Sequence, residues 1–378
     1  MTIPFNKPPY LESSESMVLS ALRDGKLSGG GPFSQMSKEW LMKKNPDIDQ
    51  VLLTTSCTHA LEISAVLLNL KDGDEVIVPS YTFVTSALAF VMHGAKIRFC
   101  DIRKDTLNID EALLESAITK KTKAIVVVHY AGVACEMDAI MAIAKKHNLA
   151  VIEDNAHGLF GKYKGVNLGS IGDFASHSFH ETKNISCGEG GALFVKDPEL
   201  SQRANIILEK GTNRQQFLNG QVDKYSWVDK GSSYVLSDLL AALLYSQLSH
   251  SHHIQSKREL MWNIYFKNLE GWASGQGITL PFVPAHCEQT YHMFYLMMPD
   301  QLSRDALIAS LGKKNISTAF HYVPLHSSKM GSEIALKDQD NCPISSSVSN
   351  RIVRLPLFYN LENADQVKVI DALTALIL

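Results

Sequence analysis

Residues 123–153 read KAIVVVHYAGVACEMDAIMAIAKKHNLAVIE, and this stretch decides the fold. It opens with an apolar, β-branched run that ends at Val128 and closes with a second such run at residues 149–153. Between the two runs, apolar residues recur at helical intervals over residues 136–147. A strand, a helix of this length and a second strand form a βαβ unit, whose two strands run parallel.

The same kind of strand occurs twice more toward the N-terminus. Val76-Ile-Val-Pro79 and Lys96-Ile-Arg-Phe-Cys100 are short runs that are apolar for most of their length. Strands without polar alternation are typical of a parallel sheet that is covered by helices on both faces. The sequence therefore predicts an α/β fold with a mostly parallel sheet.

A second, smaller domain is expected after this sheet. A long helical pattern runs from about residue 236 to residue 260, with apolar residues at Ala241, Leu244 and Leu248. Beyond it, strand-like and helical segments follow one another without a βαβ order. We predict a large domain of residues 1–250 and a smaller C-terminal α+β domain of residues 251–378.

The composition excludes several classes of function. Among 378 residues the net charge is −3 and no dense Lys/Arg block occurs, which argues against a nucleic-acid groove or an anionic membrane surface. No apolar run is long enough to cross a bilayer, and the first ten residues lack the features of a signal peptide, so we expect a cytoplasmic protein. The cysteines show no C-x-x-C spacing, so we expect reduced thiols and no metal site; they are residues 57, 100, 135, 187, 287 and 342.

A phosphate-binding helix start is one candidate site. Ser56-Cys57-Thr58-His-Ala-Leu61 follows an apolar run and opens a helical pattern. The first N–H groups of a helix lack partners and carry partial positive charge, so they suit a phosphate. Taken alone, such a segment is more often an ordinary Ser/Thr helix cap than a phosphate site.

Two aromatic residues follow the strand that ends at Pro79. Tyr81 and Phe83 are expected at the carboxyl edge of the sheet, where open α/β sheets bind their ligands. An aromatic ring there can stack on a flat heterocycle. The local sequence alone favours two core aromatics.

Asp154 ends the apolar strand Val151-Ile-Glu-Asp154 at the same edge. A carboxylate that is partly buried needs a partner, and a protonated ring nitrogen would serve. On local evidence, an N-cap of the following helix is an equal alternative.

Lys183 lies in Ser178-Phe-His-Glu-Thr-Lys183-Asn, ahead of the Gly188-Glu-Gly-Gly191 turn. A desolvated lysine has a lowered pKa and can act as an amine nucleophile in Schiff-base chemistry. Glycines permit the close backbone approach that such a site needs. A single loop lysine is, however, usually a solvated surface residue.

In this order the four signals resemble the fold-type I pyridoxal 5'-phosphate (PLP) enzymes, and among them the DegT-type sugar aminotransferases. The resemblance covers almost the whole chain. It includes Gly73-Asp-Glu-Val-Ile-Val-Pro79, Glu153-Asp-Asn-Ala-His157, Gly188-Glu-Gly-Gly191, His321-Tyr-Val-Pro-Leu-His326 and Arg354-Leu-Pro-Leu-Phe358.

The resemblance implies a role for each matching residue. Lys183 forms the Schiff base with PLP, and Asp154 pairs with the pyridine nitrogen. The other implied cofactor contacts are Phe83 on the ring face, Cys57, Thr58 and Ser178 on the phosphate, and His157 near the ring hydroxyl. Many relatives have an Asn that reaches the phosphate from the neighbouring subunit; this chain has Ser233 there, a departure that puts this contact in doubt. The resemblance to fold-type I enzymes implies a homodimer with shared active sites. His321, Tyr322 and His326 are candidates for substrate contacts, although domain packing explains them equally well.

A narrower resemblance concerns the substrate. Four segments are similar to family members that aminate TDP-4-keto-6-deoxy-D-glucose at C4: His129-Tyr-Ala-Gly-Val-Ala-Cys-Glu-Met-Asp138, Lys210-Gly-Thr-Asn-Arg214, Gly220-Gln-Val-Asp-Lys-Tyr225 and His292-Met-Phe-Tyr295. The implied reaction takes an amino group from L-glutamate through pyridoxamine phosphate (PMP). It gives TDP-4-amino-4,6-dideoxy-D-galactose for a cell-surface polysaccharide such as enterobacterial common antigen. The D-gluco epimer, or amination at C3 of an isomeric keto sugar nucleotide, remains an alternative.

Three other functions fit the sequence less well. Sugar dehydratases of this family have histidine in place of the Schiff-base lysine, whereas this chain has Lys183. A nicotinamide-dependent oxidoreductase requires G-x-G-x-x-G after the first strand, and the sequence has none there. A non-catalytic sugar-nucleotide sensor is disfavoured by the presence of both Lys183 and Asp154.

Overall fold

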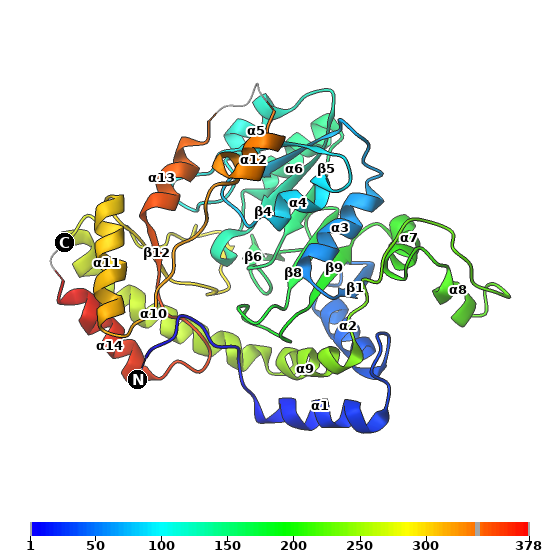
Figure 1. Cartoon of the computed structure of the whole chain (residues 1–378), viewed down its shortest axis with the longest axis horizontal. Coiled ribbons are helices and arrows are strands. Elements are labelled where there is room, and N and C mark those ends of the chain that lie inside the picture. The colour runs from blue at the N-terminus through cyan, green and yellow to red at the C-terminus, as the bar shows by residue number, and fades with distance from the viewer. Residues whose placement is uncertain (1, 337–340, 377–378) are drawn as a thin grey trace.

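The computed structural model describes residues 2–336 and 341–376 and is built around a seven-stranded sheet (Figure 1). Its order is β1-β9-β8-β5-β4-β2-β3, with bounds Gln50–Thr54, Gly191–Val195, Phe174–Ser178, Ala150–Asp154, Thr122–Val128, Glu75–Pro79 and Lys96–Cys100. All neighbours from β8 to β3 are parallel, and β9 is antiparallel to β8 and β1. The predicted α/β fold with a mostly parallel sheet is confirmed, and the four predicted strands correspond to β2, β3, β4 and β5.

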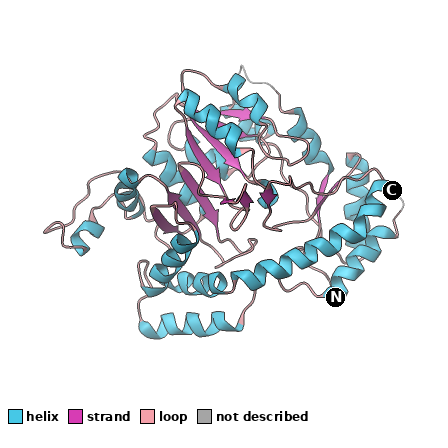
Figure 2. Ribbon diagram, turned by 180° about the vertical axis from the view of Figure 1, so that it is seen from behind, coloured by secondary structure: helices cyan, strands magenta, loops and turns pink. Residues whose placement is uncertain are grey.

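Both faces of the sheet are buried under helices (Figure 2). Along β2, Val76 and Val78 belong to the core beneath α3 (Cys57–Leu67), α4 (Thr85–Val91) and α7 (Pro198–Leu208). Ile77 belongs instead to the core that includes α5 (Glu111–Ala117) and α6 (Met137–His147). Successive side chains of a strand point to opposite faces, so a strand that is buried on both sides is apolar at most of its positions.

A separate hydrophobic core lies in the C-terminal part of the chain. It is formed by α10 (Ser251–Gly275), α11 (Gln301–Lys313), α14 (Asn363–Thr374) and the antiparallel pair β11 (Tyr295–Met297) and β12 (Ile352–Arg354). This core has helices and antiparallel strands, as expected of an α+β domain. The division between residues 250 and 251 remains a prediction.

The helix predicted over residues 236–260 is two helices. α9 (Asp238–Ser249) has His250 as its C-cap, and α10 begins at Ser251. The run Ser249-His-Ser-His-His has weak helix formers at every position, which explains a break there. α1 (Glu12–Asp24) and α2 (Pro32–Lys44) pack against α9.

The remaining elements are short. β6, β7 and β10 form a small sheet of their own. Its strands are β6 (Lys162–Tyr163), β7 (Val166–Asn167) and β10 (Cys287–Glu288). The other short elements are α8 (Arg214–Leu218), α12 (Lys329–Ile334), α13 (Pro343–Arg351) and two 3₁₀ turns, Tyr130–Gly132 and Leu325–Ser327. Among the described residues, no helix has the length and apolar character needed to span a membrane, and no His/Cys/Asp/Glu cluster suited to a metal occurs. All six cysteines are free thiols.

Candidate active site

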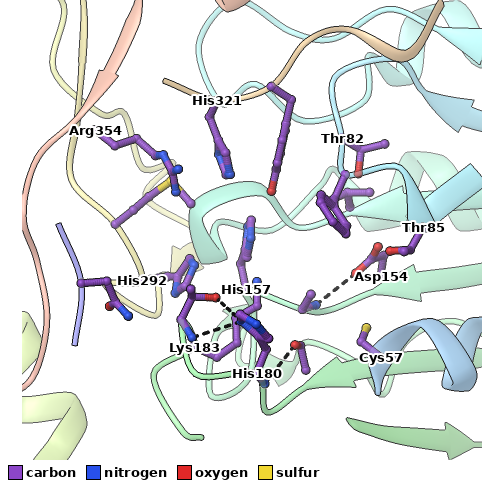
Figure 3. Close-up of a pocket in the computed structure, with 18 of the residues that line it drawn as sticks. Cys57, Thr82, Thr85, Asp154, His157, His180, Lys183, His292, His321 and Arg354 are labelled. Carbon is purple, nitrogen blue, oxygen red and sulfur yellow. Dashed lines mark hydrogen bonds between the residues drawn. The ribbon is translucent and has the colours of Figure 1, made fainter. Parts of the chain in front are cut away.

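A cavity of about 670 Å³ lies at the carboxyl edge of the parallel strands (Figure 3). The ends of β4, β5 and β8, the loop after β2 and the start of α3 all reach it. The structure brings together nine of the predicted residues on its wall: Cys57, Thr58, Phe83, Asp154, His157, Ser178, Lys183, His321 and Tyr322. This is the edge at which open α/β sheets bind ligands.

Asp154 is the last residue of β5 and is only 4% exposed. Ser86 Oγ donates to its Oδ2 at 2.6 Å, and the Ala156 N–H donates to its Oδ1 at 3.2 Å. Burial raises the pKa of this carboxyl, and the two hydrogen bonds and the Lys183 amine act against that rise. The site thus holds a buried carboxylate that a cationic partner would stabilise.

Lys183 follows β8 in the segment that leads to the glycine turn. Its side chain is half-buried, and within the described residues its Nζ has no hydrogen bond or ion pair. Burial lowers the pKa of the amine to about 8; the Cys57 thiol and Asp154 limit the fall, and the Arg354 guanidinium adds to it. About a tenth of this amine is therefore uncharged at pH 7, far more than for an ordinary lysine, and the uncharged form is the one that acts as a nucleophile.

This lowered pKa makes a prediction for the protein without cofactor. The uncharged fraction of Lys183 should rise about tenfold per pH unit below pH 8 and level off above it. The rate of covalent PLP attachment, followed by absorbance after mixing, should show the same profile. An amine with the ordinary lysine pKa would keep gaining rate to about pH 10, and that result would contradict the prediction.

The start of α3 forms a cradle beside Lys183. Ser56 caps the helix by accepting from the His59 N–H at 3.2 Å, so Cys57 and Thr58 occupy its first turn. Gly191 makes this close packing possible, since a Cβ there would lie 2.4 Å from the Ser56 carbonyl carbon and 2.5 Å from the Cys57 nitrogen. The N–H groups of a first helical turn are free to bind an anion.

Three imidazole rings lie one beside another on the opposite wall. His157 stacks on His292 with ring centroids 4.4 Å apart, and His321 lies 6.1 Å from His157. Burial holds the pKa of all three well below the usual value, so the rings are neutral. Among the described residues, His157 Nδ1 is buried without a hydrogen-bond partner. A buried orphan nitrogen of this kind indicates a ligand group that would complete it.

The tautomer of His292 follows from its neighbour Asn184. The Asn184 amide nitrogen donates to Thr290 O at 2.8 Å and to Gln255 Oε1 at 3.0 Å. Its oxygen is therefore the acceptor for His292 Nδ1 at 2.9 Å. This places the His292 proton on Nδ1. The same hydrogen bond holds Asn184, the residue that directly follows Lys183.

Phe83 and Arg354 differ from the buried residues of the site. Phe83 is 54% exposed, and its ring lies 6.2 Å from that of Tyr322. Arg354, at the end of β12, is the second cationic side chain beside Lys183 among the described residues of the wall. Its Nη2 donates to Phe320 O at 3.2 Å, and its Nε is buried without a partner.

Two predicted residues lie away from the cavity. Leu325 N donates to Ser80 O at 2.8 Å, and His326 Nδ1 is hydrogen-bonded to Ser80 Oγ at 2.5 Å, so this turn docks on the end of β2. His326 therefore belongs to the packing between the two parts of the chain. Ser233 is exposed, pairs with Glu209 and does not line the cavity of its own chain. Its predicted contact with a neighbouring subunit stays a prediction.

Several residues of the wall were not predicted from the sequence, among them Phe5, Asn6, His292 and Arg354. His292 and Arg354 stand in motifs that carry the family resemblance, but nothing in those motifs indicates a role for either side chain. Phe5 and Asn6 had no signal, because nothing in their spacing indicates that the start of the chain crosses the cavity.

The comparisons with known proteins agree with this geometry. The model of the DegT/DnrJ/EryC1/StrS aminotransferase family matches residues 11–374. The chain is 36% identical over 331 residues to an uncharacterized protein of Methanocaldococcus jannaschii, covering 85% of this chain and 84% of that protein. It is 32% identical over 379 residues to the spore coat polysaccharide biosynthesis protein SpsC of Bacillus subtilis, covering 98% and 96%.

A similar structure has been solved with and without the amino group on its cofactor. The Spr1654 protein of Streptococcus pneumoniae in its PMP-form superposes with a TM-score of 0.90 at 27% identity, covering 98% of each chain. Its PLP-form gives 0.89 at 26% identity, covering 99% of this chain and 98% of that one.

Proposed function

Because this chain belongs to the DegT/DnrJ/EryC1/StrS aminotransferase family, and a sugar aminotransferase of similar structure has PLP- and PMP-forms, we propose a specific reaction for it. It transfers the amino group of L-glutamate to C4 of TDP-4-keto-6-deoxy-D-glucose and gives TDP-4-amino-4,6-dideoxy-D-galactose. The observation that carries the proposal is the cavity in which the Lys183 amine, the Asp154 carboxylate and the start of α3 meet. The sequence motifs around His129, Lys210 and His292 support the choice of sugar.

The residues of the cavity fit PLP at each of its polar groups. We assign the phosphate to the N–H groups of Cys57 and Thr58 and the hydroxyls of Thr58 and Ser178. Asp154 would hold a proton on the ring nitrogen, and His157 Nδ1, which has no partner among the described residues, would face the ring hydroxyl. Phe83 supplies an exposed ring for stacking. Bound there, PLP would supply an aldehyde that carries the amino group and a ring that takes up electrons.

Lys183 is the proton-transfer group in this proposal. In its uncharged form the amine takes a proton from the α-carbon of the amino donor and returns one to the carbon that receives nitrogen. A pKa of about 8 suits both directions, since the charged and uncharged forms are then both populated near neutral pH. The stacked neutral imidazoles exclude water from one side without adding a competing charge.

We assign the carboxylate of the amino donor to Arg354. An amino acid must bring its α-carbon to Lys183, and its carboxylate is attached to that same carbon. Arg354 is close enough to lower the pKa of Lys183, and the described residues leave most of its N–H donors unused. A guanidinium with free donors is well suited to a carboxylate. His321 and Tyr322, on the adjoining wall, are assigned to the sugar.

The decisive experiment offers the holoenzyme TDP-4-keto-6-deoxy-D-glucose and L-glutamate. NMR coupling constants of the product then distinguish an axial amine at C4 from an equatorial one. An axial amine supports the proposal. An equatorial amine, or turnover only with a C3-keto isomer, would replace it with the corresponding alternative.

The sequence similarity to a spore coat polysaccharide biosynthesis protein supports a role in cell-surface polysaccharide synthesis.

We also propose a homodimer whose active sites lie at the subunit interface. The arm of residues 209–235, which includes α8, projects from the body of the molecule (Figure 1). Its two ends meet where Glu209 pairs with Ser233. It exposes Phe217, Leu218, Tyr225 and Trp227, the last of them 81% exposed. Exposed apolar clusters of this kind mark protein interfaces.

Sedimentation equilibrium should therefore give twice the mass of one chain. The Trp227→Ser protein should shift toward the monomer and lose activity in proportion. A strictly monomeric species with full turnover would contradict the dimer.

A further inference from the structure

The first residues of the chain form a strap across the mouth of the cavity. We define this strap as residues 2–10. One end is fixed by hydrogen bonds from Ile3 N to Asn315 O at 2.8 Å and from Ser317 N to Ile3 O at 3.0 Å. The other end is fixed by Gln247 Nε2, which donates to Pro9 O at 2.9 Å. The strap is therefore anchored both to the C-terminal core and to α9.

Between these anchors the strap contributes two side chains to the cavity, Phe5 and Asn6. Asn6 Nδ2 donates to Glu181 O at 3.3 Å, two residues before Lys183. This contact holds the strap against the segment that carries Lys183. Phe5 is half-buried and belongs to the strap that Figure 3 shows as a blue trace beside His292.

The ring of Phe5 covers one face of the Arg354 guanidinium, whose central carbon lies 4.7 Å from the ring centroid. Within the described residues, the side chain of Arg354 has one hydrogen bond, to Phe320 O, and no ion pair. A single hydrogen bond leaves a guanidinium free to rotate about its long side chain. Contact with an aromatic face restricts that rotation and keeps the N–H donors at the edge available.

We propose that Phe5 is a positioning residue, which holds the Arg354 guanidinium so that its free N–H groups receive the carboxylate of the amino donor. The inference rests on the proposed function of Arg354 at the same site. It assigns the strap to the recognition of the amino donor and leaves the keto sugar to other residues. The chemistry it selects is a carboxylate beside an amino group, which the diphosphate of the sugar nucleotide lacks.

The test replaces Phe5 in the holoenzyme and compares the two substrates. Phe5→Met keeps an apolar side chain of similar length but removes the aromatic face. We expect KM for L-glutamate to rise about three- to thirtyfold, the range of a partly desolvated cation–π contact, with kcat and KM for the keto sugar little changed. Phe5→Trp, which restores an aromatic face, should recover most of the glutamate affinity. Phe282→Leu alters an exposed ring outside the cavity and serves as the control.

A binding measurement without turnover completes the test. Calorimetric titration of the cofactor-free protein with glutarate should show weaker binding for Phe5→Met and for Arg354→Gln. The double variant should bind no more weakly than Arg354→Gln alone, because the ring acts only through the guanidinium. If Phe5→Met does not fold, the same comparison between Phe5→Trp and Phe5→Leu decides the matter.

The possible failures are distinguishable. Unchanged glutamate affinity in Arg354→Gln overturns the assignment of Arg354, and with it this inference, whatever Phe5 does. Weakened affinity in Arg354→Gln but not in Phe5→Met overturns only the positioning by the ring. A rise in KM for the sugar nucleotide instead of glutamate would show that Arg354 holds the diphosphate, and would overturn the inference as stated.

Discussion

Lys183→Ala is expected to abolish transamination and to leave the chain folded. Lys183 is the only lysine among the described residues of the cavity wall, so both covalent attachment of PLP and proton transfer are lost together. We expect kcat to fall by at least about 10⁴-fold, the upper end of what a positioned acid–base group contributes. The cost in stability should be small, because the structure gives Nζ no hydrogen bond or ion pair among the described residues.

Borohydride reduction followed by peptide mass mapping checks the attachment directly. The wild-type protein should retain the cofactor on the peptide that contains Lys183, and the Lys183→Ala protein should retain none. Lys183→Arg keeps a positive charge and should be equally inactive. Lys162→Ala removes a surface lysine that pairs with Glu288 and should keep full activity. Substantial turnover in the Lys183→Ala protein would defeat the proposed mechanism.

Asp154→Asn is expected to lower kcat by about 10²- to 10³-fold, as the loss of a preorganised electrostatic partner does in other enzymes. An amide keeps the shape of the carboxyl but cannot hold a proton on the ring nitrogen. Burial raises the pKa of Asp154, which means that the cofactor-free fold keeps this charge at a cost. The Asp154→Asn protein without PLP should therefore be at least as stable as the wild type, although the PLP-bound variant has a much lower kcat.

Ser86→Ala is the matched control for Asp154. It removes the 2.6 Å hydrogen bond but keeps the carboxylate, so we expect a loss of no more than about tenfold. Steady-state kinetics and thermal unfolding of the cofactor-free proteins give both quantities. Equal losses of kcat in the two variants would mean that Asp154 acts through local packing and not through its charge.

The large sheet and the centre of the site could be predicted because both depend on local sequence. A strand that is buried on both faces is apolar at most of its positions, so β2, β3, β4 and β5 were recognisable as separate runs. A residue that follows such a run lies at the carboxyl edge, which identified Asp154, and the glycine turn drew attention to Lys183. Order along the chain then made the family resemblance specific.

The rest of the wall could not be predicted because it depends on long-range packing. Phe5 reaches the cavity only because the strap is anchored to Asn315 and Ser317, far along the chain. His321 and His326 belong to one motif, yet only His321 lines the cavity, since the turn after it docks on Ser80. No periodicity or spacing carries that information.

The place of Gly191 links the assembly of the sheet to ligand capture. Gly191 pairs with Thr54 across β1 and β9, two strands that are far apart in sequence, and the backbone of Ser56 and Cys57 lies against it. The proposed phosphate site therefore depends on the pairing of β9 with β1. On the proposed function, we expect a chain that lacks this pairing to bind PLP poorly, so PLP would stabilise the completed domain by mass action.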